Sequence, residues 1–465
     1  MRGRGGWSWP GFNHEAGRRG CTWKSARPSM GAGFYLNIIN RNDGPGVCHD
    51  TVRCVESARA SGARAGPCDN RRQRRPGRAC MKGFSMNLLL DIARGAAALL
   101  VFLFHIRDAL VEPLPVLAAM VSFGSLGVPM FFVISGYVIS ASAEATLSRS
   151  ETSASFLKRR FMRIFPPFWL SIAVVVAVPY VIAAVSSLKS GVFEMPDPRF
   201  LSMTGGDWLW LATLLRVFGT PDGDLQAAFS PVNSVYWTLA IEFQFYLCMY
   251  LALLARRYFH LLIGLVTGVS LLLLLRPLPL DAGWFIRYWP MFSVGIALQY
   301  MLAAGWGGER FVPWRARGVA AALAGGVLLG VLVLAYRGTL GQVLLAVFPS
   351  VELGFAVVCA LLLWLAAPSG SALEAHRDGG HPLLRWLLKP AAYLGVISYS
   401  VYLLHGKLVQ LPAMVVRQVI EPSNPLNPLI CVLLTLALCA LFHRWAERPF
   451  MSKRQQAINE KVLES

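Results

Sequence analysis

The sequence predicts an all-α membrane protein that crosses the bilayer about ten times, with both termini in the cytoplasm. The first observation behind this prediction is composition: of 465 residues, 55% are hydrophobic and 15% charged, with a mean hydropathy of +0.50. Soluble domains carry about 25% charged residues. The second observation is that apolar stretches of about 20 residues, enough to cross about 30 Å of hydrocarbon as a helix, recur from Leu88 onward. Both observations therefore argue against a purely cytosolic globular enzyme.

The predicted spans run from residue 88 to residue 446. They lie near 88–111, 120–143, 164–188, 233–255, 258–276, 283–303, 317–336, 341–367, 391–415 and 426–446. The stretch 207–218 is apolar but too short to cross, so we expect a re-entrant or interfacial element there.

Basic residues predict which connections face the cytoplasm. Loop 144–163 holds five Lys and Arg residues, whereas loop 189–232 holds three against five acids. Cytoplasmic loops carry an excess of Lys and Arg. An even number of spans with both ends inside satisfies the alternation.

The chain divides into three parts. Residues 1–85 hold fourteen Arg and two Lys against five acids, without periodicity or a signal-peptide core. A tail that binds nucleic acid or anionic lipid is one interpretation; we favour a disordered or wrongly assigned extension, with no nucleic-acid partner. Residues 86–452 form the membrane domain, and 453–465 a short polar cytoplasmic tail, so we expect the chemistry among the helices.

The chemical motifs of soluble enzymes are missing. The nine cysteines form no CxxC pair, no histidines stand at zinc spacing, and no glycine-rich phosphate loop occurs. The sequence therefore predicts no metal site and no bound cofactor.

The first span carries the most informative pair of residues, Arg94 and His105. An ionisable group near the bilayer centre costs at least about 2.5 kcal/mol unless it faces protein or water. Eleven residues make about three helical turns, so both side chains share one face, roughly 16 Å apart. We expect a cation and a base to point into one interior path. The alternative is a snorkelling arginine and a packing histidine.

A carboxylate in the fourth span forms the second candidate. Glu242, in the segment 237–246, falls near mid-depth, close to the expected level of His105. A carboxylate at this depth must be paired with a cation, protonated or hydrated. Glu242 could meet this need by orienting the histidine or by pairing with an arginine.

Two further segments offer polar groups. The ninth span contains the hydroxyls of Tyr399 and Tyr402 and a second histidine, His405. Tyr402 could equally be an interfacial residue, and His405 a structural one. Arg160 and Arg163 precede the third span one turn apart. Topology alone would explain them, but guanidinium groups also suit the phosphate oxygens of a cytosolic anion such as coenzyme A.

Together, these segments resemble the acyltransferase 3 family of integral-membrane enzymes. The resemblance covers about residues 86–452 and rests on motifs in a kept order: Arg94-x10-His105, Gly127 to Tyr137, Arg160-x-x-Arg163 before Pro166-Pro167, Trp237 to Tyr246, Ile397 to His405, and Glu447-Arg-Pro-Phe450. Two positions depart from the pattern of some members: Phe243 and Pro129 stand where those members carry an acid. A mechanism with two carboxylates is therefore doubtful.

The resemblance implies a multi-pass protein of the cell inner (plasma) membrane. It would move an acyl group, in the first instance acetyl, from acyl-CoA to a hydroxyl of a carbohydrate acceptor: exopolysaccharide, O-antigen, a lipid-linked sugar or a small glycoside. His105 would be the general base, and Arg94 would hold the donor or stabilise developing charge. Glu242 would act in orientation, and the substrates would meet Arg160, Arg163, Asp91, Tyr399 and His405. The main alternative is a transporter or flippase for a glycan, lipid or small anion; a scaffold with buried charges is the second.

Overall fold

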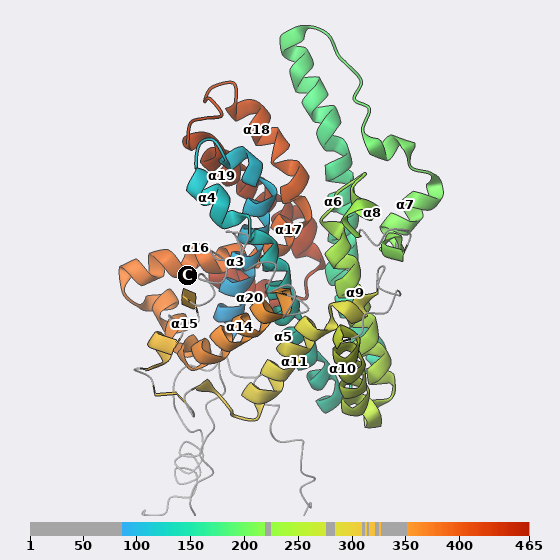
Figure 1. Cartoon of the computed structure of the whole chain (residues 1–465), viewed down its shortest axis with the longest axis vertical. Helices are drawn as coiled ribbons and strands as arrows, with labels where there is room; N and C mark the ends of the chain where they lie inside the picture. Colours follow the sequence, from blue (N-terminus) through green and yellow to red (C-terminus); the bar gives the residue numbers. More distant parts are fainter. Residues whose placement is uncertain are drawn as a thin grey trace, which may run out of the picture.

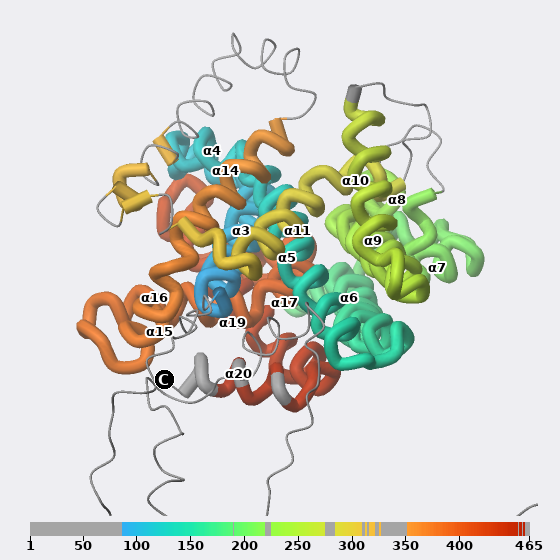
Figure 2. Tube along the Cα trace, turned by 90° about the horizontal axis from the view of Figure 1, so that it is seen from below, coloured from blue at the N-terminus to red at the C-terminus, as the bar shows by residue number. Residues whose placement is uncertain are grey.

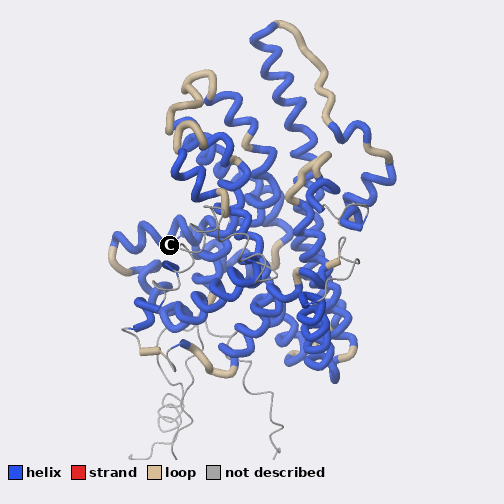
Figure 3. Tube along the Cα trace, in the orientation of Figure 1, coloured by secondary structure: helices blue, strands red, loops and turns tan. Residues whose placement is uncertain are grey.

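The structure is a computed structural model that describes residues 86–218, 225–275, 284–308 and 351–464, with short stretches between 312 and 326. All regular secondary structure in these ranges is helical, and no strand occurs in them (Figure 3). The all-α prediction is thus confirmed for the described part of the chain. The predicted head, residues 1–85, lies outside it.

Helix α3 (Asn87–His105) is the central element of the fold. It contacts α5 (Gly127–Ser148), α16 (Pro382–Val396) and α17 (Ser398–Leu408). Figure 2 shows α3 among these helices, and α11 (Trp289–Ala303) packs against α5. The leucines and alanines of α3 favour a helix, and several of them are buried against the neighbouring helices. Of the polar side chains of α3, those of Asp91 and Arg94 are mostly buried, whereas that of His105 at the end of the helix is exposed.

Glycines allow the helices around α3 to approach closely. A Cβ atom on Gly295 of α11 would stand 1.9 Å from the carbonyl oxygen of Val133 in α5, and one on Gly136 would stand 2.1 Å from that of Phe292. A Cβ atom on Gly395 of α16 would stand 2.0 Å from a backbone oxygen of α3. In lipid, apolar side chains gain little by packing against each other instead of against lipid tails. Small residues therefore stabilise helix pairs there, because they let the two backbones approach closely.

A second group of helices packs against this centre. Helix α6 (Ser153–Ser190) has 38 residues, or about 57 Å, so it exceeds the bilayer core, and it rises above its neighbours in Figure 1. Its first turn is capped by Thr152, which accepts a hydrogen bond from the Ser155 amide. Helix α9 (Tyr236–Leu254) contacts α6 and α5, and α10 (Phe259–Leu275) contacts α9 and α11.

Seven helices in the described ranges are long and apolar enough to cross a membrane, and an eighth results if α16 and α17 count as one broken span. The chain is therefore a multi-pass membrane protein by the length and composition of its helices. Ten spans are not reached within the described residues. Predicted span 317–336 falls mostly outside them, and of predicted span 341–367 the structure describes α14 (Val351–Ala366).

Two predicted spans differ from the observed helices. The range 391–415 is not one helix: the chain bends by 74° between α16 and α17, and α18 (Gln410–Val416) follows. The bend lets α16 pack along α3 while α17 crosses towards the far end of α3. The range 283–303 yields α11, a helix of 15 residues that begins next to Pro290, because proline favours the first turn of a helix.

The remaining helices complete the described part of the chain. As expected, 207–218 forms only short helices, α7 (Gly205–Ala212) and η4 (Leu215–Phe218), with α8 (Leu225–Phe229) nearby. Helix α4 (Pro115–Val121) precedes α5, and α15 (Gly370–Gly379) precedes α16. Helix α19 (Leu426–Phe442) continues into a π-helical turn, and the polar tail forms α20 (Lys453–Glu464).

Candidate active site

Two adjoining hollows lie between α3, α5, α9 and α17. We call the first the arginine hollow; the polar residues that line it are Arg94, Ser135, Arg160, Arg163, Thr238, Glu242, Tyr246, Ser398, Tyr399 and Tyr402. We call the second the histidine hollow; its polar and aromatic lining consists of Phe104, His105, Ser125, Phe132, Gln226, Ser234, Trp237, Thr238, Tyr288, Glu352 and Tyr402.

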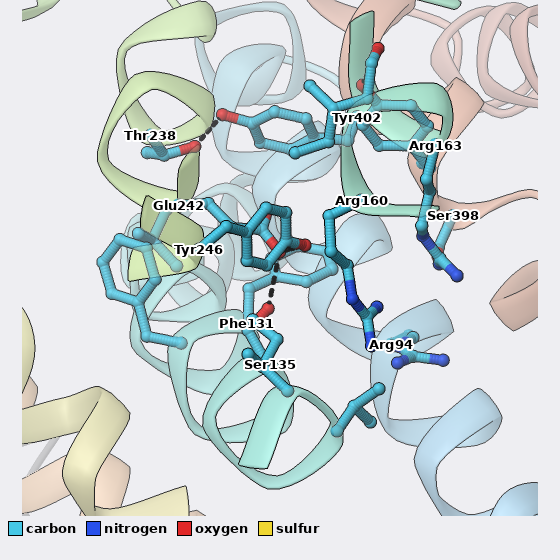
Figure 4. A pocket seen from close by; sticks show the side chains of 16 residues that line it. Arg94, Phe131, Ser135, Arg160, Arg163, Thr238, Glu242, Tyr246, Ser398 and Tyr402 are labelled. Atoms are coloured by element: carbon cyan, nitrogen blue, oxygen red, sulfur yellow. Dashed lines mark hydrogen bonds between the residues drawn. The ribbon is translucent and has the colours of Figure 1, made fainter. Parts of the chain in front are cut away.

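Three guanidinium groups define the arginine hollow. Arg94 comes from α3, and Arg160 and Arg163 come from one turn of α6; in Figure 4 they lie opposite Glu242 of α9. Arg94 Nη1 lies 3.5 Å from Asp91 Oδ1, one helical turn away. Three cations thus share their surroundings with two carboxylates. The hollow carries a positive excess that suits an anionic ligand.

Glu242 is held by hydroxyl groups. Its Oε1 atom accepts hydrogen bonds from Ser135 Oγ at 2.9 Å and from the Tyr246 hydroxyl at 2.7 Å. The Arg160 guanidinium carbon lies 5.7 Å from the centre of the Tyr246 ring, within the range of a cation–π contact. Glu242 therefore belongs to the arginine hollow, and the described contacts include none between it and His105. The expectation that it orients the histidine is not met by this geometry.

Tyr399 joins α17 to α6 beside the arginines. Its hydroxyl donates a hydrogen bond to the backbone carbonyl of Ile164 at 2.9 Å, and its side chain lines the arginine hollow. The sequence-based placement of Tyr399, Arg160 and Arg163 near one ligand site agrees with this arrangement, although they come from segments more than 230 residues apart.

The two hollows share a wall, which we call the septum: Val128, Phe132, Thr238 and Tyr402 line both. The Tyr402 hydroxyl is hydrogen-bonded to the Thr238 hydroxyl and to the Val235 carbonyl. Arg94 lines only the arginine hollow, and His105 only the histidine hollow. The expectation of a single path is therefore corrected to two hollows in contact, because side chains from α5, α9 and α17 fill the space between the two residues.

His105 ends α3, and its exposed side chain lines the histidine hollow. Its Nδ1 atom lies 2.8 Å from the carbonyl oxygen of Val101. A carbonyl only accepts hydrogen bonds, so Nδ1 carries the hydrogen and Nε2 carries a lone pair. Trp237 and Tyr288 stand on the same hollow with their ring centres 5.4 Å apart. The hollow thus combines a base with aromatic faces.

His405 and Asp91 line neither hollow. His405 is fully buried behind His105, with its Nε2 atom 3.4 Å from His105 Nδ1. Asp91 reaches the arginine hollow only through Arg94. In the described part of the chain, no group of three or more His, Cys, Asp or Glu side chains is arranged to hold a metal ion.

Thr238, Tyr246 and Ser135 line the arginine hollow although the sequence analysis did not single them out, and Tyr402 lines it although the sequence left open an interfacial role. A signal for two of them was present. Thr238, Glu242 and Tyr246 are spaced by four residues, which places them on one face of α9. Ser135 and Tyr402 lie on other helices, and only the packing of those helices brings them here.

The fold and the site together define a polytopic membrane protein with a polar, cation-rich centre between its helices. A family model described as "Acyltransferase domain" matches residues 87–444. Because this match covers most of the chain, the protein belongs to the acyltransferase 3 family.

Individual relatives match over shorter lengths. The protein named O-acetyl transferase of Shigella phage Sf6 is 29% identical over 161 residues, which cover 34% of this chain and 43% of that protein. Nodulation protein 10 of Rhizobium leguminosarum bv. viciae is 30% identical over 130 residues, covering 27% and 32%. The chain thus matches less than half the length of these curated relatives. No solved structure gives a significant match.

Proposed function

We propose that the protein is an O-acyltransferase that moves an acyl group, in the first instance acetyl, from acyl-CoA to a hydroxyl of a carbohydrate acceptor at the inner membrane. One observation carries this proposal: a cation-rich hollow and a hollow with an accessible histidine base share a wall, the septum. A donor in the first and an acceptor in the second would meet at that wall.

The arginine hollow suits the donor. Coenzyme A carries several phosphate charges, which Arg160 and Arg163 would bind through charge-assisted hydrogen bonds. Further bases surround the lower end of α6: Arg159 contacts Glu151 at 2.7 Å, and Arg256 donates to the Glu151 carbonyl at 2.7 Å. The positive-inside rule assigns this basic end to the cytoplasm, where acyl-CoA is made. Arg94 would hold the donor from the side of α3.

The histidine hollow suits the acceptor. His105 Nε2 would take the proton of the acceptor hydroxyl as its oxygen bonds to the thioester carbon. The bond from carbon to sulfur then breaks, and the protonated imidazole returns its proton to the sulfur, giving an ester and free coenzyme A. General-base catalysis typically contributes about 10²–10⁴-fold in rate. Trp237 and Tyr288 offer apolar faces against which a sugar ring could stack.

The family and one relative's name support the type of reaction. The family model describes acyltransferase domains, and the phage relative carries the name O-acetyl transferase. The acceptor would be an exopolysaccharide, O-antigen, lipid-linked sugar or small glycoside, as the family resemblance implies.

A carrier for a glycan, lipid or small anion is the second candidate. The observation that favours it is the septum itself, because two adjoining polar hollows that share one wall also fit a transport path that opens to each side in turn.

One experiment separates the two functions. The full chain, purified in detergent, is incubated with acetyl-CoA and a panel of glycans, and free thiol and product mass are measured. We expect thiol release that depends on the glycan, together with a glycan heavier by one acetyl group. His105→Ala should lose both activities while eluting as a folded protein. Glycan or anion uptake into proteoliposomes without acyl-CoA consumption would favour the carrier and contradict the proposal.

A further inference from the structure

A second imidazole stands directly behind His105. His405, on α17, has no exposed surface, and its ring centre lies 4.9 Å from that of His105 with the ring planes 75° apart. Phe102 covers another side of it at 5.6 Å. A polar ring buried this completely must satisfy its nitrogens within the protein.

The hydrogen bonds of His405 determine its tautomer. Its Nδ1 atom lies 2.9 Å from the Val401 carbonyl oxygen and 3.0 Å from the Tyr402 carbonyl oxygen. Both partners can only accept, so Nδ1 carries the hydrogen. The Nε2 atom of neutral His405 therefore has a lone pair, and the nearest donor to it is Nδ1 of His105 at 3.4 Å.

The same reasoning applied to His105 makes the two rings complementary. Its Nδ1 hydrogen faces the Val101 carbonyl at 2.8 Å and His405 Nε2 at 3.4 Å, so two acceptors share one donor. Moving the hydrogen to Nε2 of His105 would set its Nδ1 lone pair against both acceptors. The two contacts thus favour the tautomer of His105 that carries its hydrogen on Nδ1. In this tautomer the Nε2 atom has a lone pair and can act as a base.

The charged groups near His105 and His405 do not act as the acceptor for the Nδ1 hydrogen of His105. Arg107, just beyond α3, lies over the Phe104 ring at 4.4 Å and donates to the Phe104 carbonyl at 3.1 Å. Glu352 of α14 lines the histidine hollow. Among the described residues, no carboxylate forms an ion pair or hydrogen bond with either imidazole, so the position that a carboxylate often holds behind a catalytic histidine is taken by His405.

Neighbouring contacts hold His405 in place. Asn233 Nδ2 donates a hydrogen bond to the Leu403 carbonyl at 3.0 Å, and the Tyr402 hydroxyl is bonded to Thr238. At Gly406, a Cβ atom would stand 3.3 Å from Asn233 Oδ1, so the helix lies close against this loop. The backbone that carries His405 is therefore anchored on both sides of the residue.

We propose that His405 is a positioning residue for the acyl transfer: together with the Val101 carbonyl, it holds His105 in the tautomer whose Nε2 lone pair faces the acceptor hydroxyl. This inference rests on the proposed function. While His105 holds the hydroxyl proton, before passing it to the leaving sulfur, the His405 lone pair also faces the positively charged ring. His405 itself neither gains nor loses a proton in the reaction.

The test combines substitutions at both histidines. His405→Leu removes the acceptor and keeps an apolar side chain, whereas His405→Gln can present a carbonyl oxygen towards His105. We expect His405→Leu to lower kcat by about 10–100-fold, as for other partners that orient a functional histidine, with the KM for acetyl-CoA unchanged. His405→Gln should recover most of kcat. In a His105→Ala background, His405→Leu should change nothing further, because His405 acts through His105.

A spectroscopic measurement tests the tautomer directly. In solid-state ¹⁵N NMR of the full chain labelled at histidine, the His105 signals are those missing from His105→Ala. We expect Nδ1-protonated His105 in the wild type and a mixture of tautomers in His405→Leu. An Nε2-protonated His105 in the wild type would overturn the inference, and so would unchanged kcat in His405→Leu or a loss that persists equally in His405→Gln. If His105→Ala itself keeps activity, the proposed base is wrong, which is a separate failure.

Discussion

The hydroxyl of Tyr402 is hydrogen-bonded to that of Thr238, and this contact lies in the septum between the hollow of Arg94 and the hollow of His105. The two side chains come from α17 and α9, which are far apart in the chain. Their contact therefore depends on how the helices of the bundle pack. It lies between the two hollows, where the sequence alone predicts a single path from Arg94 to His105.

Removing the Tyr402 ring should join the two hollows. We expect Tyr402→Ala to admit water to the thioester, so that acetyl-CoA hydrolysis without acceptor rises relative to acetyl transfer. Tyr402→Phe keeps the ring and loses only the hydroxyl contacts, so it should retain more of the coupling. Thiol release measured with and without acceptor checks this. An unchanged ratio in Tyr402→Ala would show that the septum does not exclude water.

The arginines of α6 should determine affinity for the donor. We expect Arg160→Gln to raise the KM for acetyl-CoA by about 10–100-fold, because a hydrogen bond to a charged group is worth about 1.5–3 kcal/mol. Arg159→Gln is the matched control: Arg159 is the preceding residue, but its side chain binds Glu151 at the surface. Equal KM values for the two variants would remove Arg160 from the donor site.

The close contact of α5 and α11 predicts a stability effect. Gly295→Ala places a methyl group 1.9 Å from the Val133 carbonyl oxygen, so the helices must separate, and we expect a loss of about 1–3 kcal/mol or more. Gly264→Ala on α10 meets no atom within 4 Å and should be neutral or stabilising by up to about 1 kcal/mol. Thermal unfolding in detergent compares the two variants, and similar midpoints would contradict the packing argument.

The cap of α7 predicts a response to acid. Hydrogen bonds from Thr204, and a further one from Arg216, lower the pKa of Asp207 to about 2 from its usual 3.8. A lowered pKa means that the cap contributes stability above about pH 4 and loses it as the pH falls towards 2. Hydrogen exchange at amides 205–212, corrected for intrinsic rates, should accelerate in that window. Asp207→Asn should abolish the pH dependence, and if the variant kept it, another group would be responsible.

Local features of the site were predictable from the sequence, and contacts between helices were not. The spacing of Arg94 and His105 predicts a shared helix face, and each of them lines a hollow; Arg160 and Arg163, one turn apart, line the same hollow. The roles of these four residues stay predictions. Arg94 and His105 are separated by roughly 16 Å along α3, which leaves room for other side chains between them. Nothing in the sequence shows that Tyr402 occupies this space. Glu242 likewise accepts a hydrogen bond from Ser135 instead of contacting His105, because the packing of the helices decides which side chains become neighbours.

The number of spans shows a second limit. Hydropathy recognises apolar stretches but not where a helix turns, so 391–415 was predicted as one span although the chain bends by 74° within it. The bend follows from packing: Gly395 lies against the backbone of α3, and α17 then crosses to the other end of the same helix.

The bend has a mechanical consequence. Over the three turns of α17, Tyr399 lines the arginine hollow, Tyr402 lies in the septum and His405 backs the base. One short helix thus contacts both hollows. A shift of α17 that changes the contacts in one hollow also moves the groups that line the other. The two substrates should therefore bind cooperatively rather than independently.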